Sequence, residues 1–249
     1  MENQGRPNDG CGEAADKHIN AMLGKHISIC EDSLTASVFT HLLHLPCEVF
    51  WRIMRNACYA EKLPEYPGEP QEIESWPKWD PTGTGNSIYV EPDVFMRFPD
   101  FDLIVEAKRR DDRQQNPEQW RRELIGYLNE YGEERRQVRI IALGGIWTNA
   151  DDEVTDPVRP EPRCPVHMCK WERVLEQCKR MLKEIRRLKY PTSQNKAHEH
   201  ILSDLIDLFG WHEFQTGIWF ADVAHDLPQL SSWVHGHHKT FQQYYPSTF

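Results

Sequence analysis

A short apolar run in the middle of the chain predicts a strand that is covered on both faces. Residues 103–105 (Leu-Ile-Val) are consecutive and apolar, which is typical of a strand inside a packed sheet. Residues 98–101 (Phe-Pro-Asp-Phe) precede the run, and proline at this place favours a type I turn. We therefore predict an antiparallel hairpin that is symmetric about this turn. Its register places Asp93 directly opposite Glu106.

Two further segments predict strands beside the hairpin. Residues 138–147 are mainly apolar and include Gly144 and Gly145, which permit a bend at the end of a buried strand. Residues 71–79 are a candidate first strand, and Pro77 would confine that strand to an edge of the sheet or cut it short. These segments therefore predict further strands of the same sheet.

Apolar residues at helical spacing predict five helices. Two of these helices are predicted by their starts, at residues 31–35 and 116–120. The other three are predicted over residues 47–59, 163–189 and 197–209. Asp32 or Ser33 is a candidate N-cap of the first helix. The helix within 163–189 is long and amphipathic, with lysines and arginines opposite an apolar stripe that includes Trp171 and Leu188.

The connecting segments suggest how the chain is divided. Residues 60–70 and 148–166 are rich in proline and acidic residues, which predicts connectors. Residues 1–27 are expected to be a mobile N-terminal segment. We expect residues 28–148 to form an α/β core. Residues 149–249 are expected to be a mainly helical C-terminal extension that contacts a partner, a second copy or DNA.

Charged residues occupy one end of the predicted hairpin, where a buried strand would normally carry none. Glu106 and Lys108 end the apolar run two residues apart, so they face the same side of the sheet. Asp93 lies opposite Glu106 with Cβ atoms roughly 5 Å apart, and the same register places Glu91 opposite Lys108. Two buried carboxylates without compensation are costly. A divalent cation such as Mg²⁺, which prefers oxygen ligands, would remove that cost.

These residues resemble the signature of a known nuclease superfamily. Pro92-Asp93 followed by Glu106-Ala107-Lys108 is similar to the motif that gives the PD-(D/E)XK superfamily its name. The predicted order of helix, strand, hairpin, helix and strand also resembles the restriction-endonuclease-like core. The resemblance implies an α/β fold with a mixed central sheet flanked by helices. A solvated surface hairpin is the alternative interpretation of the same residues.

The resemblance implies a role for each residue of the motif. It covers roughly residues 28–148 and implies that Asp93 and Glu106 bind Mg²⁺, with Mn²⁺ as a substitute. The carbonyl of Ala107 is implied as a further ligand. Lys108 would orient or activate the water that attacks a phosphodiester.

Two helices carry additional candidates. Members of the superfamily commonly place a Glu on a helix before the first strand, and Glu31 matches that position as a catalytic residue and metal ligand. The alternative is that Glu31 complements the positive end of its helix. Members also carry a Gln, with a Tyr four residues later, on the helix after the Glu-x-Lys strand. Gln119 matches the Gln, but Glu123 stands at the four-residue step and Tyr127 lies one turn further, which puts a role for Tyr127 in doubt. A polar helix face with i,i+4 pairs is the alternative.

The distribution of charge suggests where nucleic acid would bind. The formal net charge of −10 argues against a general nucleic-acid coat protein, but a nuclease needs only a local basic surface. The candidates follow Lys108 or lie on the basic side of the amphipathic helix: Arg109, Arg110, Arg113, Lys179, Lys183 and Arg187. A solvated helix face is the alternative for the last three.

The composition of the chain bears on its cellular location and on zinc binding. No apolar run approaches the roughly 20 residues of a membrane span, and the polar N-terminus lacks the apolar region of a signal peptide. The seven cysteines are scattered, which favours a reducing cytoplasm. Four residues crowd together but fit none of the usual zinc patterns: Cys164, His167, Cys169 and Cys178.

The resemblance therefore implies an Mg²⁺-dependent endonuclease, and the composition favours a cytoplasmic location. The preference for DNA over RNA, and for a restriction or anti-phage setting, comes from the resemblance. The alternative is a catalytically silent or partner-dependent subunit with the same fold, which binds nucleic acid or protein in a larger complex or homo-oligomer. The presence of Asp93, Glu106 and Lys108 together favours the enzyme, because a degenerate copy usually loses at least one of them.

Overall fold

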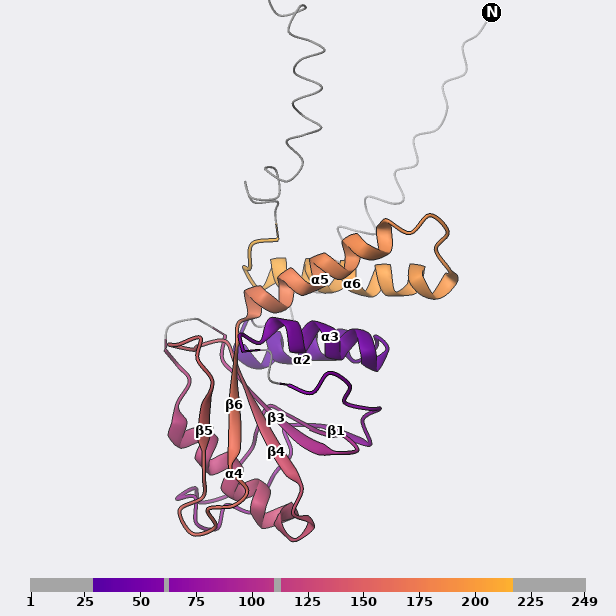
Figure 1. Ribbon diagram of the computed structural model, residues 1–249. Helices are drawn as coiled ribbons and strands as arrows, with labels where there is room; N and C mark the ends of the chain where they lie inside the picture. The colour runs from indigo at the N-terminus through magenta and orange to yellow at the C-terminus, as the bar shows by residue number, and fades with distance from the viewer. Residues whose placement is uncertain (1–28, 61–62, 110–112, 217–249) are drawn as a thin grey trace, which may run out of the picture. The chain divides into compact units, whose positions relative to one another are not determined.

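The computed structural model describes residues 29–60, 63–109 and 113–216. They form a mixed α/β fold in which a six-stranded sheet, with the order β1-β2-β3-β4-β6-β5, is flanked by helices (Figure 1). The strands are β1 (Glu72–Ser75), β2 (Val94–Arg97), β3 (Phe101–Ala107), β4 (Gln137–Leu143), β5 (Asp152–Val154) and β6 (Cys164–Cys169). The helices are α2 (Glu31–Leu42), α3 (Cys47–Ala57), α4 (Pro117–Tyr131), α5 (Trp171–Arg186) and α6 (Ser193–Trp211), with a 3₁₀ turn, η1 (Gly132–Glu134). The predicted mixed sheet with flanking helices is confirmed, while the expected mobile segment, residues 1–27, lies outside the described residues.

The hairpin of β2 and β3 has the register that the sequence predicts. Val94 pairs with Val105, and the Phe98 N–H donates to the Phe101 carbonyl at 2.9 Å across the turn. β1 pairs with β2 and forms an edge of the sheet, as expected for a strand followed closely by Pro77. β4 runs parallel to β3, and β6 runs parallel to β4. The carboxyl ends of these three neighbouring strands therefore lie on the same side of the sheet, beside one another.

The predicted pairing of Glu91 with Lys108 is wrong. β2 begins only after Glu91, which is exposed. The preceding residue, Val90, pairs instead with Trp79 through two backbone hydrogen bonds. Lys108 has meanwhile turned toward β4, where its backbone N–H donates to the Leu143 carbonyl at 2.7 Å. The hairpin contact therefore reaches as far as Asp93, whose side chain accepts the Ala107 N–H, but is lost by Glu91.

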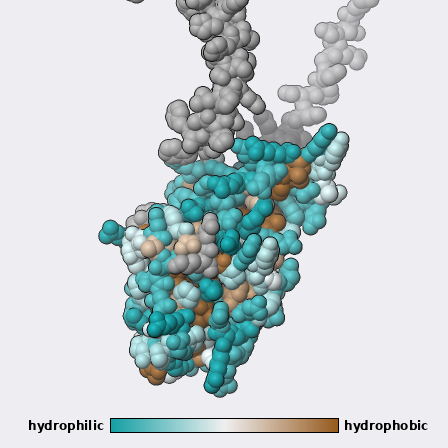
Figure 2. Space-filling model, viewed as in Figure 1, coloured by the Kyte–Doolittle hydropathy of each residue, from teal (hydrophilic) through white to brown (hydrophobic). Residues whose placement is uncertain are grey.

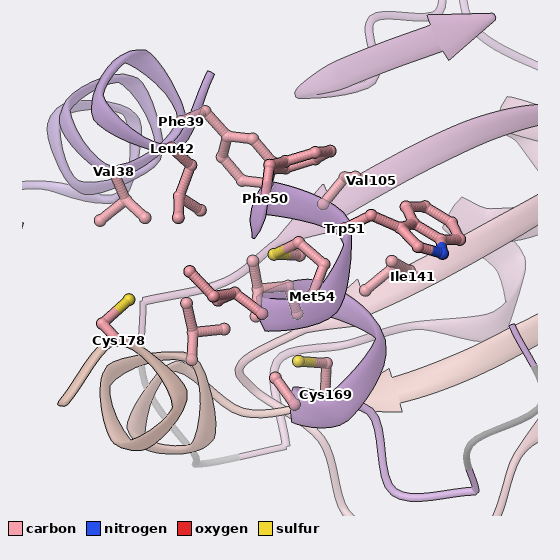
Figure 3. Packing of buried hydrophobic residues seen from close by; sticks show 14 of the residues in the cluster. Val38, Phe39, Leu42, Phe50, Trp51, Met54, Val105, Ile141, Cys169 and Cys178 are labelled. Carbon is pink, nitrogen blue, oxygen red and sulfur yellow. The ribbon is translucent and has the colours of Figure 1, made fainter. Parts of the chain in front are cut away.

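Each face of the sheet covers its own hydrophobic cluster. On one face, Val105 packs in a cluster with Trp51 and Met54 of α3 and with residues of α2, α5 and α6 (Figure 3). On the other face, Ile104 belongs to a cluster with Trp120 of α4. Successive residues of a strand point to opposite faces, so covering both faces explains why every residue of β3 is buried.

The apolar sides of α5 and α6 pack as their sequence pattern predicts. Val174 and Cys178 of α5 and Leu202 and Phe209 of α6 are completely buried in the same cluster as α2 and α3. These four helices lie together in Figure 1, apart from α4. Leu188 is an exception to the predicted apolar stripe, because it follows the end of α5 and is exposed.

The predicted division of the chain at residue 148 is not observed. Residues 163–169 were expected within a helix and 148–166 within a connector, but β5 and β6 lie there and extend the sheet. Pairing of β6 with β4 overrides the local proline signal, because Pro165 lies near the start of the strand, where a missing N–H is tolerated. The described residues up to Phe214 form one compact unit.

The first helix begins earlier than its predicted cap. Cys30, rather than Asp32 or Ser33, is the N-cap of α2. The Ser33 N–H donates to the Cys30 sulfur at 3.4 Å, and the Ser33 hydroxyl accepts from the Cys30 N–H at 3.1 Å. This reciprocal arrangement makes Glu31 the first residue of the helix and directs the start of α2 toward the end of β3.

The surface is largely polar on the side that Figure 2 shows. Hydrophilic residues predominate there, and hydrophobic residues occur in small separate groups. Of the helices within the described ranges, none has the length and apolar character required to cross a membrane.

Candidate active site

The carboxyl end of β3 is held in place from several directions. Its next residue, Lys108, donates its N–H to β4, and its carbonyl accepts from the Trp171 indole N–H at 2.9 Å. Gly144 follows β4 with φ +69°, and a Cβ there would lie 2.0 Å from the Lys108 carbonyl oxygen. Only glycine fits this approach. The backbone that presents Glu106 and Lys108 is therefore tightly constrained.

Lys108 lies between two carboxylates. Its ammonium group contacts Oε1 of Glu31 at 3.1 Å, the carboxylate of Glu106, and the carbonyl of Ala107 at 3.1 Å. Burial by itself would lower the pKa of Lys108, but the negative charges of Glu106 and Glu31 outweigh it and raise that pKa above its ordinary value. Lys108 is therefore a fixed positive charge at the end of β3.

Asp93 immediately precedes β2 and is largely buried. One carboxylate oxygen accepts the Ala107 N–H at 2.8 Å, and the other accepts the Trp76 indole N–H at 3.2 Å. Burial, and then the negative charge of Glu106, raise the pKa of Asp93 to about 7. The structure thus brings Asp93 beside the Glu106–Lys108 pair, as the hairpin register predicts.

Glu31 of α2 and Gln119 of α4 also contact the Glu106–Lys108 pair. Glu31 pairs with Lys108 through one oxygen and accepts the Arg109 N–H through the other at 3.1 Å. Gln119 of α4 donates its amide N–H to Oε1 of Glu106 at 2.6 Å. α4 begins at an Asn116 cap with proline in its first turn, so the predicted helix start is confirmed. Residues far apart in the sequence therefore meet at the end of β3.

Glu123 is a further acidic residue here to which no role was given from the sequence. It lies one turn after Gln119 on α4, is 1% exposed, and its carboxyl group is next to that of Glu106. No donor among the described residues bonds to either of its carboxylate oxygens. Burial, followed by the negative charges of Glu106 and Asp93, raises the pKa of Glu123 well above its ordinary value. The four-residue spacing from Gln119 was the signal in the sequence, but it could not show the burial.

Gln115 is a second residue that sequence reasoning missed. Its amide N–H donates to the Glu106 carbonyl at 2.9 Å, and its amide oxygen accepts the Trp120 indole N–H at 2.7 Å. Tyr127, in contrast, lies outside the group. It donates to Oδ2 of Asp102 at 2.8 Å, near the opposite end of β3. Gln115 therefore ties α4 to the site, whereas Tyr127 belongs to a separate polar centre.

The predicted nucleic-acid contacts near Lys108 are only partly described. The Arg109 guanidinium pairs with Glu213 at 2.8 Å and its side chain is 18% exposed. Arg113 is exposed and has φ 64°. Arg110 lies outside the described residues. Of the two described residues, Arg113 is the one that the structure leaves accessible to a phosphate.

The basic residues of α5 are not gathered around the carboxylates. α5 begins at Trp171, which touches Lys108, and each residue adds 1.5 Å along the helix axis. Lys179 therefore lies roughly 12 Å along this axis, Lys183 roughly 18 Å and Arg187 roughly 24 Å. Lys183 and Arg187 are exposed. These residues could meet a long nucleic acid but not a group bound at the end of β3.

The donor set suits a hard divalent cation. Four carboxylates (Glu31, Asp93, Glu106 and Glu123) against one ammonium group (Lys108) leave a formal charge of −3 when all are ionised. Oxygen ligands of this kind are those that Mg²⁺ and Mn²⁺ accept, and among the described residues no group donates a hydrogen bond to either oxygen of Glu123.

The carboxylates do not form a ready-made cage. Within the described ranges, no three Asp, Glu, His or Cys side chains converge on a single metal position. The ammonium group of Lys108 lies between Glu31 and Glu106, and Asp93 is turned toward the Ala107 N–H. Binding of a cation would therefore require side chains to move.

Comparison with known proteins assigns no activity. No protein-family model matches the chain, and no solved structure matches it. An uncharacterized protein of Pasteurella multocida (strain Pm70) is 27% identical over 186 residues, which is 73% of this chain and 69% of that protein.

Proposed function

We propose that the protein is a nuclease with a restriction-endonuclease-like core that hydrolyses phosphodiester bonds with Mg²⁺ or Mn²⁺. The observation that carries this proposal is the meeting of Asp93, Glu106 and Lys108 at the end of β3. Glu31 and Gln119 reach the same Glu106–Lys108 pair from two different helices. Five polar groups from four parts of the chain are a large set for a structural ion pair, because buried charge is costly to retain.

Each residue then has a defined part in the reaction. Asp93, Glu106, the Ala107 carbonyl and Glu31 are the groups that would hold the cation. The chemistry that this ion supplies is polarisation of a phosphoryl oxygen and activation of water. Lys108 orients the attacking water or offsets the negative charge that develops on the phosphorane. Gln119 holds the Glu106 carboxylate in position through its hydrogen bond.

The expected substrate is DNA, and the expected location is the cytoplasm. None of the six cysteines in the described residues forms a disulfide, which fits a reducing compartment. The DNA preference and a restriction or anti-phage setting follow from the superfamily resemblance. Arg113 supports the proposal as the exposed cation close to Lys108 in sequence.

A plasmid-nicking assay tests the proposal. Purified protein with Mg²⁺ or Mn²⁺ is expected to nick supercoiled DNA, and EDTA is expected to abolish the reaction. Asp93→Asn and Lys108→Met are each expected to lower the rate by at least roughly 100-fold, the scale on which one charge-stabilising group acts. Asp100→Asn is the matched control, because Asp100 is exposed in the turn of the same hairpin. Cleavage that survives in both site variants would refute the proposal.

A second candidate is a subunit that cuts only with a partner, or does not cut at all. The observation that favours it is the ammonium group of Lys108 between two carboxylates, which leaves no ready-made cation cage in the described part of the chain. The net charge of −10 points the same way. Wild-type protein that folds but cuts no single-stranded DNA, duplex DNA or RNA would favour this candidate, and copurification would then identify the partner.

A further inference from the structure

Within the described part of the chain, Glu123 is a buried acidic residue whose carboxylate oxygens accept no hydrogen bond from any donor. Two other buried carboxylates show the usual arrangement. Asp102 accepts from Arg97, Arg136 and Tyr127. Asp156 accepts from Arg159 and from the backbone N–H of Val158. Among the described residues, both oxygens of Glu123 are buried with no donor at all.

The surroundings of Glu123 offer it no cation of its own, and the carboxyl group of Glu106 beside it can hydrogen-bond to it only if one of the two carries a proton. The charged groups that act on it are the carboxylates of Glu106 and Asp93 and the ammonium group of Lys108. Lys108 is already shared by Glu31, Glu106 and the Ala107 carbonyl. A carboxylate cannot donate to another carboxylate, so the Glu106–Glu123 contact is unfavourable unless a positive group joins it.

The position of Glu123 on α4 directs it to the same side of β3 as Glu106. Gln119 is one turn earlier on the same helix face and bonds directly to the Glu106 carboxylate at 2.6 Å. Glu106 has the same strand parity as Ile104, whose side chain packs in the α4-side cluster. Glu123 and Glu106 therefore face each other between helix and sheet, where bulk water does not reach.

We propose that Glu123 is an additional ligand for the divalent cation and that it binds this ion together with Glu106. The inference rests on the proposed function, and it deepens that function by adding an acidic ligand from α4 to the residues of the PD-(D/E)XK motif. A hard cation with oxygen ligands satisfies both orphaned oxygens of Glu123 and offsets the acidic excess at once. The alternative is a proton shared between the two carboxyl groups.

Binding of Mn²⁺ to the full chain separates these alternatives. Isothermal titration with MnCl₂ is expected to show binding to the wild type and affinity lowered at least about tenfold in Glu123→Gln. Glu118→Gln is the matched control, since Glu118 is on the same helix but is exposed and pairs with Arg121. This control is expected to bind Mn²⁺ as the wild type does. Glu123→Asp, which keeps a shorter carboxylate, is expected to fall between the wild type and the Gln variant.

Stability without metal gives a second, independent measurement. In EDTA, Glu123→Gln is expected to melt at or above the temperature of the wild type, because a neutral amide replaces an unpartnered carboxyl group. A Gln variant that fails to fold in EDTA would show that Glu123 makes a structural hydrogen bond and would overturn the inference.

The possible failures are distinguishable. Equal Mn²⁺ affinity in the wild type and in Glu123→Gln, with weaker binding in Asp93→Asn, would overturn the role of Glu123 and leave the nuclease proposal intact. Wild-type protein that binds no Mn²⁺ would overturn the inference, while the nicking assay would still decide the proposed function separately.

Discussion

Replacement of Asp102 by Asn tests whether the two ends of β3 have different roles. Asp102 is completely buried near the start of the strand, where it pairs with Arg97 at 3.3 Å and Arg136 at 3.0 Å. It also accepts the hydroxyl of Tyr127 at 2.8 Å. These contacts join β2, β3 and α4 with the segment that leads into β4. We therefore expect Asp102→Asn to weaken the fold and to leave the site chemistry unchanged.

The magnitude follows from what Asn keeps and what it loses. Removing one partner of a buried ion pair typically costs about 3–5 kcal/mol of the free energy of unfolding. Asn retains the volume and one acceptor oxygen, and the side chains of Arg97 and Arg136 are 16% and 20% exposed, so water can still reach them. We expect a loss of about 3 kcal/mol, at the lower end of that range. At about 2–4 °C per kcal/mol, the melting temperature would fall by roughly 6–12 °C.

Urea denaturation followed by tryptophan fluorescence measures this loss. The midpoint is expected to fall with an unchanged m value, and Asp100→Asn in the neighbouring turn is expected to stay within about 0.5 kcal/mol of the wild type. Glu106 lies four residues further along β3, roughly 13 Å away, so nicking by the folded variant should match the wild type. A variant as stable as the wild type, or one that stays folded but no longer nicks DNA, would refute this division of roles.

Two further substitutions test neighbouring contacts. Tyr127→Phe is expected to cost about 0.5–1.5 kcal/mol of the free energy of unfolding, which is the value of one hydrogen bond, and to leave nicking unchanged. A loss of cleavage without a loss of stability would instead place Tyr127 in the reaction. Gly144→Ala is expected to destabilise the protein by at least about 1–3 kcal/mol, because alanine is strained at φ +69° and its Cβ would collide with the Lys108 carbonyl. The nicking rate of this variant, measured well below its melting temperature, is also expected to fall. Normal stability and activity would show that the end of β3 is less constrained than its contacts indicate.

The sequence predicted the hairpin well because its signals are local. The turn at residues 98–101 and the two-residue period of β-strands define the register that places Asp93 opposite Glu106. Such rules reach only as far as one element and its immediate partner. Gln119 was expected at the site from the superfamily resemblance rather than from helix geometry, and its side chain does contact Glu106.

The features that sequence reasoning missed depend on contacts between distant segments. β6 joins the sheet through parallel pairing with β4, which no local pattern of residues 163–169 reveals and which the prolines obscured. Lys108 pairs with Glu31, which is 77 residues away, rather than with Glu91. Arg109 pairs with Glu213, which is 104 residues away, a contact that no local pattern of the sequence indicates.

The contrast between the two buried acidic centres of β3 supports the proposed site. At the start of the strand, Asp102 has two guanidinium groups and a hydroxyl, and its charge is fully compensated. At the other end, the carboxylates outnumber the single ammonium group of Lys108, and Glu123 has no donor among the described residues. A fold able to compensate one buried carboxylate so thoroughly could compensate the other. Its failure to do so at the carboxyl end, where three parallel strands and the start of α2 meet, is the physical reason to expect a positively charged ligand there.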